Sequence, residues 1–169
     1  MKKKVLVLLF VAVLAIAPAM AASTRGTSSD GSFGIGLNLG TNTGLGMKFG
    51  MGKFDILANV GLADFNIGSN GFKLGGDVAV SYEVYDIDIK GPHHMPVTLG
   101  LGAKMNFRFE DNFGFDLALV VPVGLEYQIP DVPVAFYVRL APGISIMENT
   151  QVNINFAFAG YIGVLWMFE

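Results

Sequence analysis

Large apolar residues alternate with small or charged residues along most of this chain, with a period of two. In the segment 113–127, large apolar or aromatic side chains from Phe113 to Tyr127 occupy every odd position. The even positions hold mainly glycine, alanine and the two acidic residues Asp116 and Glu126. Because successive side chains of a β-strand point to opposite faces, the segment is predicted to be a strand with one apolar face and one small or charged face.

The same alternation predicts eight strands between Phe33 and Phe168, without any helix. Clusters of turn-forming residues separate the strands, among them those at 68–71 and 110–112, and the longest connection is 86–95. An even number of antiparallel strands with short connections is typical of bacterial β-barrels. The predicted strands are 33–40, 44–51, 54–63, 72–85, 96–109, 113–127, 134–146 and 152–168.

The first residues have the pattern of a secretory signal peptide. Three lysines at 2–4 precede the apolar run Val5–Ala17, and Ala19-Met20-Ala21 resembles a cleavage site. The run of 13 residues is shorter than the ~20 that a spanning helix needs. We therefore expect a signal peptide at 1–22, a flexible lead-in at 23–32 and one folded domain at 33–169.

Composition points toward a membrane. Hydrophobic residues make up 52% of the chain and charged residues 15%, against about 25% charged in a typical soluble protein. The part after the leader has no stretch of 18 apolar residues, so helical spans are not expected. Strands can satisfy their backbone in lipid only as a closed barrel. The predicted fold is an all-β, transmembrane, eight-stranded, antiparallel, up-and-down β-barrel.

The net charge limits the kinds of partner that we expect for this protein. Without the three leader lysines, the chain has 8 basic and 14 acidic residues, a net charge of −6. No basic patch remains, so we expect no nucleic acid as partner. The chain has no cysteine and therefore no disulfide.

In each predicted strand, the charged residues occupy the same alternate positions as the small residues and not those of the large apolar residues. They are therefore expected to face inward. An eight-stranded barrel is just wide enough to be filled by side chains, and unpaired buried charges are costly. Five basic and five acidic residues make pairing possible, and the expected result is an ion-pair network that closes the lumen. Its members are Lys48, Asp55, Lys73, Asp77, Glu83, Lys104, Arg108, Asp116, Glu126 and Arg139.

Two other interpretations remain open. One is a narrow transporter of protons or small apolar molecules, which would need a gap in the lumen lined by apolar inward residues. The other is a soluble, lipocalin-like periplasmic barrel with its apolar face inward and all ten charges outward. The candidates for lining an apolar gap are Leu57, Val120, Tyr137, Tyr161 and Leu165.

Motifs for catalysis or cofactor binding are weak. His93 and His94 lie in the predicted turn 86–95, near Asp86 and Asp88, where a solvated turn is favoured over a surface metal site. Gly-x-Gly pairs occur, but none completes a dinucleotide-binding motif. No Gly-x-Ser-x-Gly motif occurs, and no serine is placed beside the histidines. We expect no enzymatic activity, no catalytic residue, no cofactor and no metal.

Three stretches carry a resemblance to a known group of proteins. They are Gly34–Leu37 through Thr43–Leu45 with Lys48, Pro122–Tyr127, and Pro133–Phe136 into Leu140–Gly143. Together with the aromatic last strand, they resemble a little-characterised family of small bacterial outer-membrane barrels, and more broadly the OmpA, OmpX and OmpW type.

The resemblance implies a location in the cell outer membrane, contact with outer-membrane lipid and insertion by the barrel-assembly machinery. That machinery usually reads a terminal aromatic residue, whereas here Phe168 is followed by Glu169. The long surface loops of adhesive members are missing from this sequence. A structural or surface-interaction role is the leading expectation, with a monomer as the expected state.

Overall fold

The computed structural model describes residues 31–63, 73–89, 93–109 and 113–168, and their regular structure is entirely β-strand. The expected signal peptide, most of the lead-in and the turns at 68–71 and 110–112 lie outside the described residues. The strands are β1 (Phe33–Gly40), β2 (Asn42–Met51), β3 (Phe54–Ala63), β4 (Lys73–Ile89), β5 (His93–Phe109), β6 (Phe113–Val120), β7 (Val123–Gln128), β8 (Val134–Glu148) and β9 (Gln151–Phe168).

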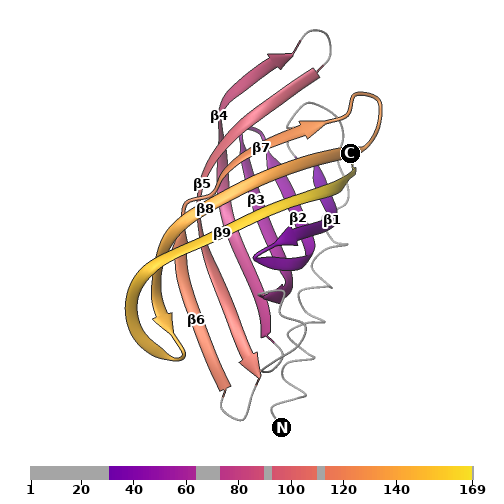
Figure 1. Cartoon of the computed structure of the whole chain (residues 1–169). Helices are drawn as coiled ribbons and strands as arrows, with labels where there is room; N and C mark the ends of the chain where they lie inside the picture. Colours follow the sequence, from indigo (N-terminus) through magenta and orange to yellow (C-terminus); the bar gives the residue numbers. More distant parts are fainter. Residues whose placement is uncertain (1–30, 64–72, 90–92, 110–112, 169) are drawn as a thin grey trace.

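Hydrogen bonds between antiparallel strands run in a ring through eight of the nine strands (Figure 1). Most neighbours in the ring are also neighbours in the chain, and β1 closes the ring by pairing with β9 from Phe33–Phe168 to Gly40–Tyr161. The expected all-β, antiparallel arrangement is confirmed. The described part of the chain contains no helix long and apolar enough to span a membrane.

The predicted strand 113–127 is divided into β6 and β7 at Val121-Pro122. Proline has no N–H and cannot donate to a ladder, which explains the interruption. The register does not change, because Val120 lies opposite Gly102 and Val123 lies opposite Leu99 on the same neighbour, β5. The structure therefore has nine strands where eight were predicted, because β6 and β7 together correspond to the single predicted strand 113–127.

The hairpin of β4 and β5 is longer than predicted, and the expected turn 86–95 is wrong. Both strands continue to the pair Ile89–His93. A register shift between Glu83 and Tyr85 moves the following residues of β4 by one position. Such an irregularity exchanges the positions that face outward and inward. The regular alternation therefore stops there, and the predicted strand 72–85 was too short.

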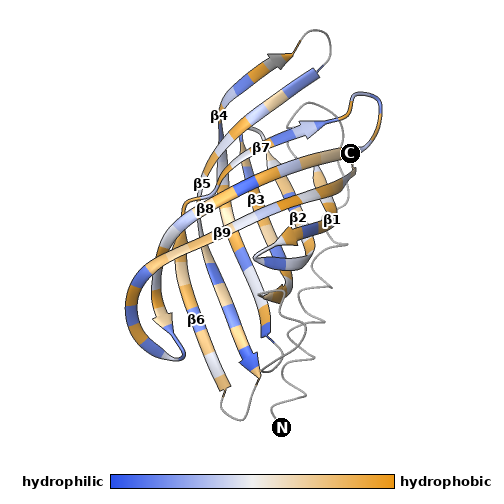
Figure 2. Ribbon diagram, viewed as in Figure 1, coloured by the Kyte–Doolittle hydropathy of each residue, from blue (hydrophilic) through white to orange (hydrophobic). Residues whose placement is uncertain are grey.

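Hydrophilic and hydrophobic residues alternate along much of the strands (Figure 2), so the two faces of the strands have opposite chemistry. The large apolar residues of the predicted outer face are exposed, with 65% exposure for Leu101 and 62% for Leu37. The inner positions include Lys48 and Arg139, each only 5% exposed. The ring therefore buries polar and charged groups and exposes aliphatic and aromatic ones.

One side of the interior is apolar. Small alanines let larger side chains from β8 and β9 fill this side, where Tyr137 is 2% exposed and Leu165 is 1% exposed. The polar residues gather mainly on the inner faces of β2, β3 and β4. The apolar cluster comprises Ala118, Val120, Ala135, Tyr137, Ala141, Ala159, Tyr161, Leu165 and Met167.

Glycines permit a close approach between the first and last strands. A methyl group at Gly36 would overlap the carbonyl oxygen of Val164 on β9. At Gly163, the missing side chain leaves the space that the Tyr137 ring occupies. Both positions lie where β1 and β9 close the ring.

Gly36→Ala is expected to lower the free energy of unfolding by about 1–3 kcal/mol, because the strands must shift to admit the methyl group. Gly160→Ala is the matched control on β9, since its methyl would meet Phe158 at an ordinary 3.6 Å. This control should be neutral or stabilising by up to about 1 kcal/mol. Urea titrations of both variants under the same conditions make the comparison, and equal effects would contradict the assigned close approach.

Candidate functional site

Four charged side chains meet in the interior of the ring. Lys48 on β2 lies with its Nζ 2.5 Å from Glu126 Oε1 on β7 and 3.4 Å from Asp55 Oδ2 on β3. Arg139 on β8 places Nη2 at 3.8 Å from Glu126 Oε2. All four residues are buried, with two positive and two negative charges. We call this group the four-charge cluster.

The four-charge cluster also contacts the apolar side of the interior. The guanidinium carbon of Arg139 lies 4.1 Å from the centroid of the Tyr137 ring. At this distance the cation is attracted by the ring face, and the contact is stronger where water is excluded. The cluster therefore joins the walls formed by β2 and β3 to those formed by β7 and β8.

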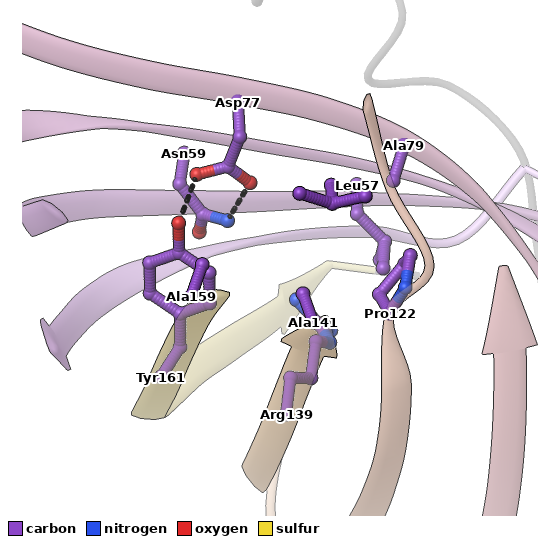
Figure 3. Close-up of a pocket in the computed structure, with 10 residues that line it drawn as sticks. Leu57, Asn59, Asp77, Ala79, Pro122, Arg139, Ala141, Ala159 and Tyr161 are labelled. Carbon is purple, nitrogen blue, oxygen red and sulfur yellow. Dashed lines mark hydrogen bonds between the residues drawn. The ribbon is translucent and has the colours of Figure 1, made fainter. Parts of the chain in front are cut away.

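Asp77 is held by neutral donors in a second group (Figure 3). Asn59 Nδ2 donates to Asp77 Oδ1 at 2.7 Å, and the Tyr161 hydroxyl donates to Asp77 Oδ2 at 2.8 Å. Asn42 Nδ2 lies at 3.4 Å from the same Oδ2. Hydrogen bonds to a carboxylate are among the stronger ones in proteins, so this group ties β2, β3, β4 and β9 together. We call it the Asp77 cluster.

The two asparagines were missed because the sequence analysis followed only charges. Asn59 shares the inward parity of Asp55 and is 4% exposed. Asn42 lies between the predicted strands 33–40 and 44–51, but in the structure it begins β2 and is fully buried. Inward parity applied to all polar residues would have found Asn59.

A third charged group, the ion pair of Arg108 and Asp116, lies near the end of the ring where β5 ends and β6 begins. Arg108 Nη2 is 2.5 Å from Asp116 Oδ1, and both side chains are about one quarter exposed. The backbone N–H of Asn149, in the turn between β8 and β9, donates to the same oxygen at 2.8 Å. The pair therefore fastens this turn to β6.

The other three predicted residues are placed by the strand register. Lys104 lies opposite Asp77, Lys73 lies opposite Arg108, and all four of these residues on β4 and β5 are half-buried. Glu83 lies opposite Thr98 and is also half-buried. None of the ten predicted residues is exposed, and the contacts of seven of them fall into three separate groups: the four-charge cluster, the Asp77 cluster and the Arg108–Asp116 pair.

The interior holds a small cavity between these clusters (Figure 3). Its volume is about 10 Å³, which is close to the space that one water molecule needs. Leu57, Val120 and Tyr161 line it, as do the polar residues Asn59 and Arg139. Of the five residues named for an apolar gap, Tyr137 and Leu165 do not line this cavity, and all except Leu57 belong to the packed apolar cluster.

Asn59→Ala is expected to lower the free energy of unfolding by about 1.5–3 kcal/mol, because Asp77 loses a short hydrogen bond in a buried setting. Asn153→Ala is the control, since Asn153 is exposed and lies 3.4 Å from Glu148. This control should change stability by less than about 0.5 kcal/mol. Denaturant titration measures both values, and a negligible effect of Asn59→Ala would contradict the role given to this contact.

The histidines are not in a solvated turn. His93 Nδ1 lies 2.7 Å from the Tyr127 hydroxyl, with the two rings stacked, and His94 Nδ1 lies 2.9 Å from Asp86 Oδ2. Both histidines thus brace neighbouring strands. Over the described ranges, no three histidine or acidic side chains gather closely enough to hold a metal ion.

The protein can be classified by its fold, but comparison with known proteins assigns it to no family. The chain is an all-β protein whose antiparallel strands form a hydrogen-bonded ring of eight. No family model, curated protein or solved structure was found to match it. The resemblance to small outer-membrane barrels stays a prediction from the residues that carry it.

Proposed function

We propose that this protein is an outer-membrane β-barrel with a closed lumen and a structural or surface-interaction role. The observation that carries the proposal is the inverted distribution of side chains. Leu37 and Leu101 are more than 60% exposed, whereas Lys48, Asp55 and Glu126 are at most 7% exposed. Soluble proteins rarely expose large continuous apolar surfaces, and lipid is the solvent that suits such a surface.

Aromatic side chains support the same proposal. Phe33 stacks on Phe168 with ring centroids 6.0 Å apart, at one end of the β1–β9 ladder. Toward the opposite end of the ring, Phe107 contacts Phe113 and Phe115 on the outer face of β5 and β6. Aromatic residues at both rims are typical of the two interfaces of a membrane.

Cell fractionation tests the location. The full chain with its leader should reach the outer-membrane fraction, after insertion by the barrel-assembly machinery, and should need detergent for extraction. The extracted protein should migrate faster on gels when unboiled, since a folded barrel is more compact than the denatured chain. A mature protein that stays dissolved in plain buffer would instead support the lipocalin-like alternative.

A closed lumen is supported by the paired charges and by the size of the cavity. The space of about 10 Å³ beside Asp77 and Arg139 is too small for a continuous water-filled path. Planar bilayers containing the purified protein should therefore show no stable, sizeable conductance. Regular open states would contradict the closed lumen and favour the narrow transporter.

A further inference from the structure

The last strand has an edge that β1 does not cover. The β1–β9 ladder ends at Tyr161, next to hydrogen bonds between Thr41 and Gly160. From Gln151 to Ala159, β8 is the strand that pairs with β9 in the described part of the chain. Figure 1 shows this part of the hairpin curving away at the lower left. We call the uncovered side of Gln151–Ala159 the β9 edge.

In the described part of the chain, no strand pairs with the backbone groups on the β9 edge. Gly160 donates its N–H to Thr41 Oγ1 at 2.9 Å and accepts from Thr41 N at 3.0 Å, so both of its groups point toward the β1 side. Alternate residues of a strand direct these groups to the same side. Phe158 and Phe156, which lie in the regular part of the β8–β9 ladder, therefore direct theirs toward the β9 edge, where a further strand could bind.

The edge lacks two of the means by which proteins block an exposed strand. The segment 151–159 contains no charged residue and no proline. Val152, Ile154 and Phe156 are 75–78% exposed. The ladder with β8 is regular from Asn155 onward, so the backbone is already held extended.

The neighbouring ladder indicates what kind of strand fits. β1 occupies the same side of β9, in antiparallel orientation, with Ile35, Leu37 and Leu39 outward and glycine or Asn38 inward. An occupant in line with β1 would continue this ladder. It would therefore have apolar residues at alternate positions, beside Ile154 and Phe156.

We propose that the β9 edge binds an extended, uncharged segment of a partner polypeptide, added antiparallel to β9 in line with β1. Two β9 edges paired with each other would be related by a twofold axis perpendicular to the sheet, which would invert one copy relative to the other. Copies inserted in one membrane share an orientation, so a separate segment is favoured over a second copy. This last step alone rests on the proposed function.

The test uses the purified full chain and a peptide with the β1 sequence Phe33–Gly40, made soluble by a neutral polyethylene glycol tail. Fluorescence anisotropy should show saturable binding. Ile154→Lys places a charge on the β9 edge and should weaken binding by about tenfold or more. Val138→Lys is the control, because Val138 is also outward and exposed but is flanked by β7 and by the part of β9 that β1 already covers. It should change the dissociation constant by less than about twofold.

Hydrogen exchange provides a second measurement that does not depend on a variant. The amides of Phe156 and Phe158 should exchange rapidly in the free protein and slowly with the peptide. Slow exchange without peptide in a monomer would show that the chain covers its own edge and would overturn the proposal. A dimer that protects these amides would assign the edge to a second copy, and absence of saturable binding would also refute the proposal. If the chain proves water-soluble, the same test runs in buffer, so the two proposals fail separately.

Discussion

Lys48→Met is expected to lower the free energy of unfolding by about 3–5 kcal/mol, the cost of leaving a buried ion pair without one partner. Lys48 contacts both Asp55 and Glu126, so the substitution leaves two buried carboxylates with Arg139 as the remaining cation of the four-charge cluster. Urea titration of the protein refolded in micelles measures the loss.

Two further variants test the cause of that loss. Lys53→Met removes the same side chain from the exposed turn between β2 and β3 and should change stability by less than about 0.5 kcal/mol. The double variant Lys48→Met, Glu126→Gln restores equal numbers of charges and should recover part of the lost stability. A loss for Lys48→Met that is no larger than that for Lys53→Met would contradict the pairing described for this cluster.

Leu101→Arg is expected to lower the free energy of unfolding in a lipid bilayer by about 2–4 kcal/mol, because the guanidinium enters the hydrocarbon region. Leu101 is 65% exposed and lies within β5, opposite Val80, away from both ends of the strand. In a water-soluble protein, the same exposed position would tolerate arginine with a change of less than about 0.5 kcal/mol. The measurement is a denaturant titration in liposomes.

Val132→Arg is the matched control for this position. Val132 is also aliphatic and 43% exposed, but it lies in the connection between β7 and β8. We expect its replacement to be nearly neutral. Equal effects of the two arginines would argue against lipid contact at Leu101 and against the proposed barrel.

The period of two predicted most of the strands because it follows directly from backbone geometry. In the segment 113–127, it assigned Leu117 and Leu125 to the outer face and Glu126 to the interior, and the exposures agree. It also placed the ends of the third strand at Phe54 and Ala63. It failed between Glu83 and Tyr85, where a local irregularity changes the parity without a strong signal in the sequence.

The grouping of the interior residues could not be predicted in the same way. Parity tells which face a residue occupies, but contacts across the ring depend on the stagger between strands that are distant in the chain. Lys48 and Glu126 meet because of that stagger, whereas Lys48 and Asp77 belong to different clusters. The Asp77 cluster further depends on Asn42 and Asn59, whose neutral side chains carried no weight in a search for charges.

Closure of the ring joins the first described strand to the last. Most other ladders connect neighbours in the sequence and can begin as local hairpins, whereas β1 and β9 meet only after the intervening chain is in place. Contacts of such high sequence separation are slow to form, because the entropy of a long loop is lost before they stabilise it. Synthesis of the chain must therefore reach β9 before the ring can close, and until then β1 exposes a free side that invites aggregation.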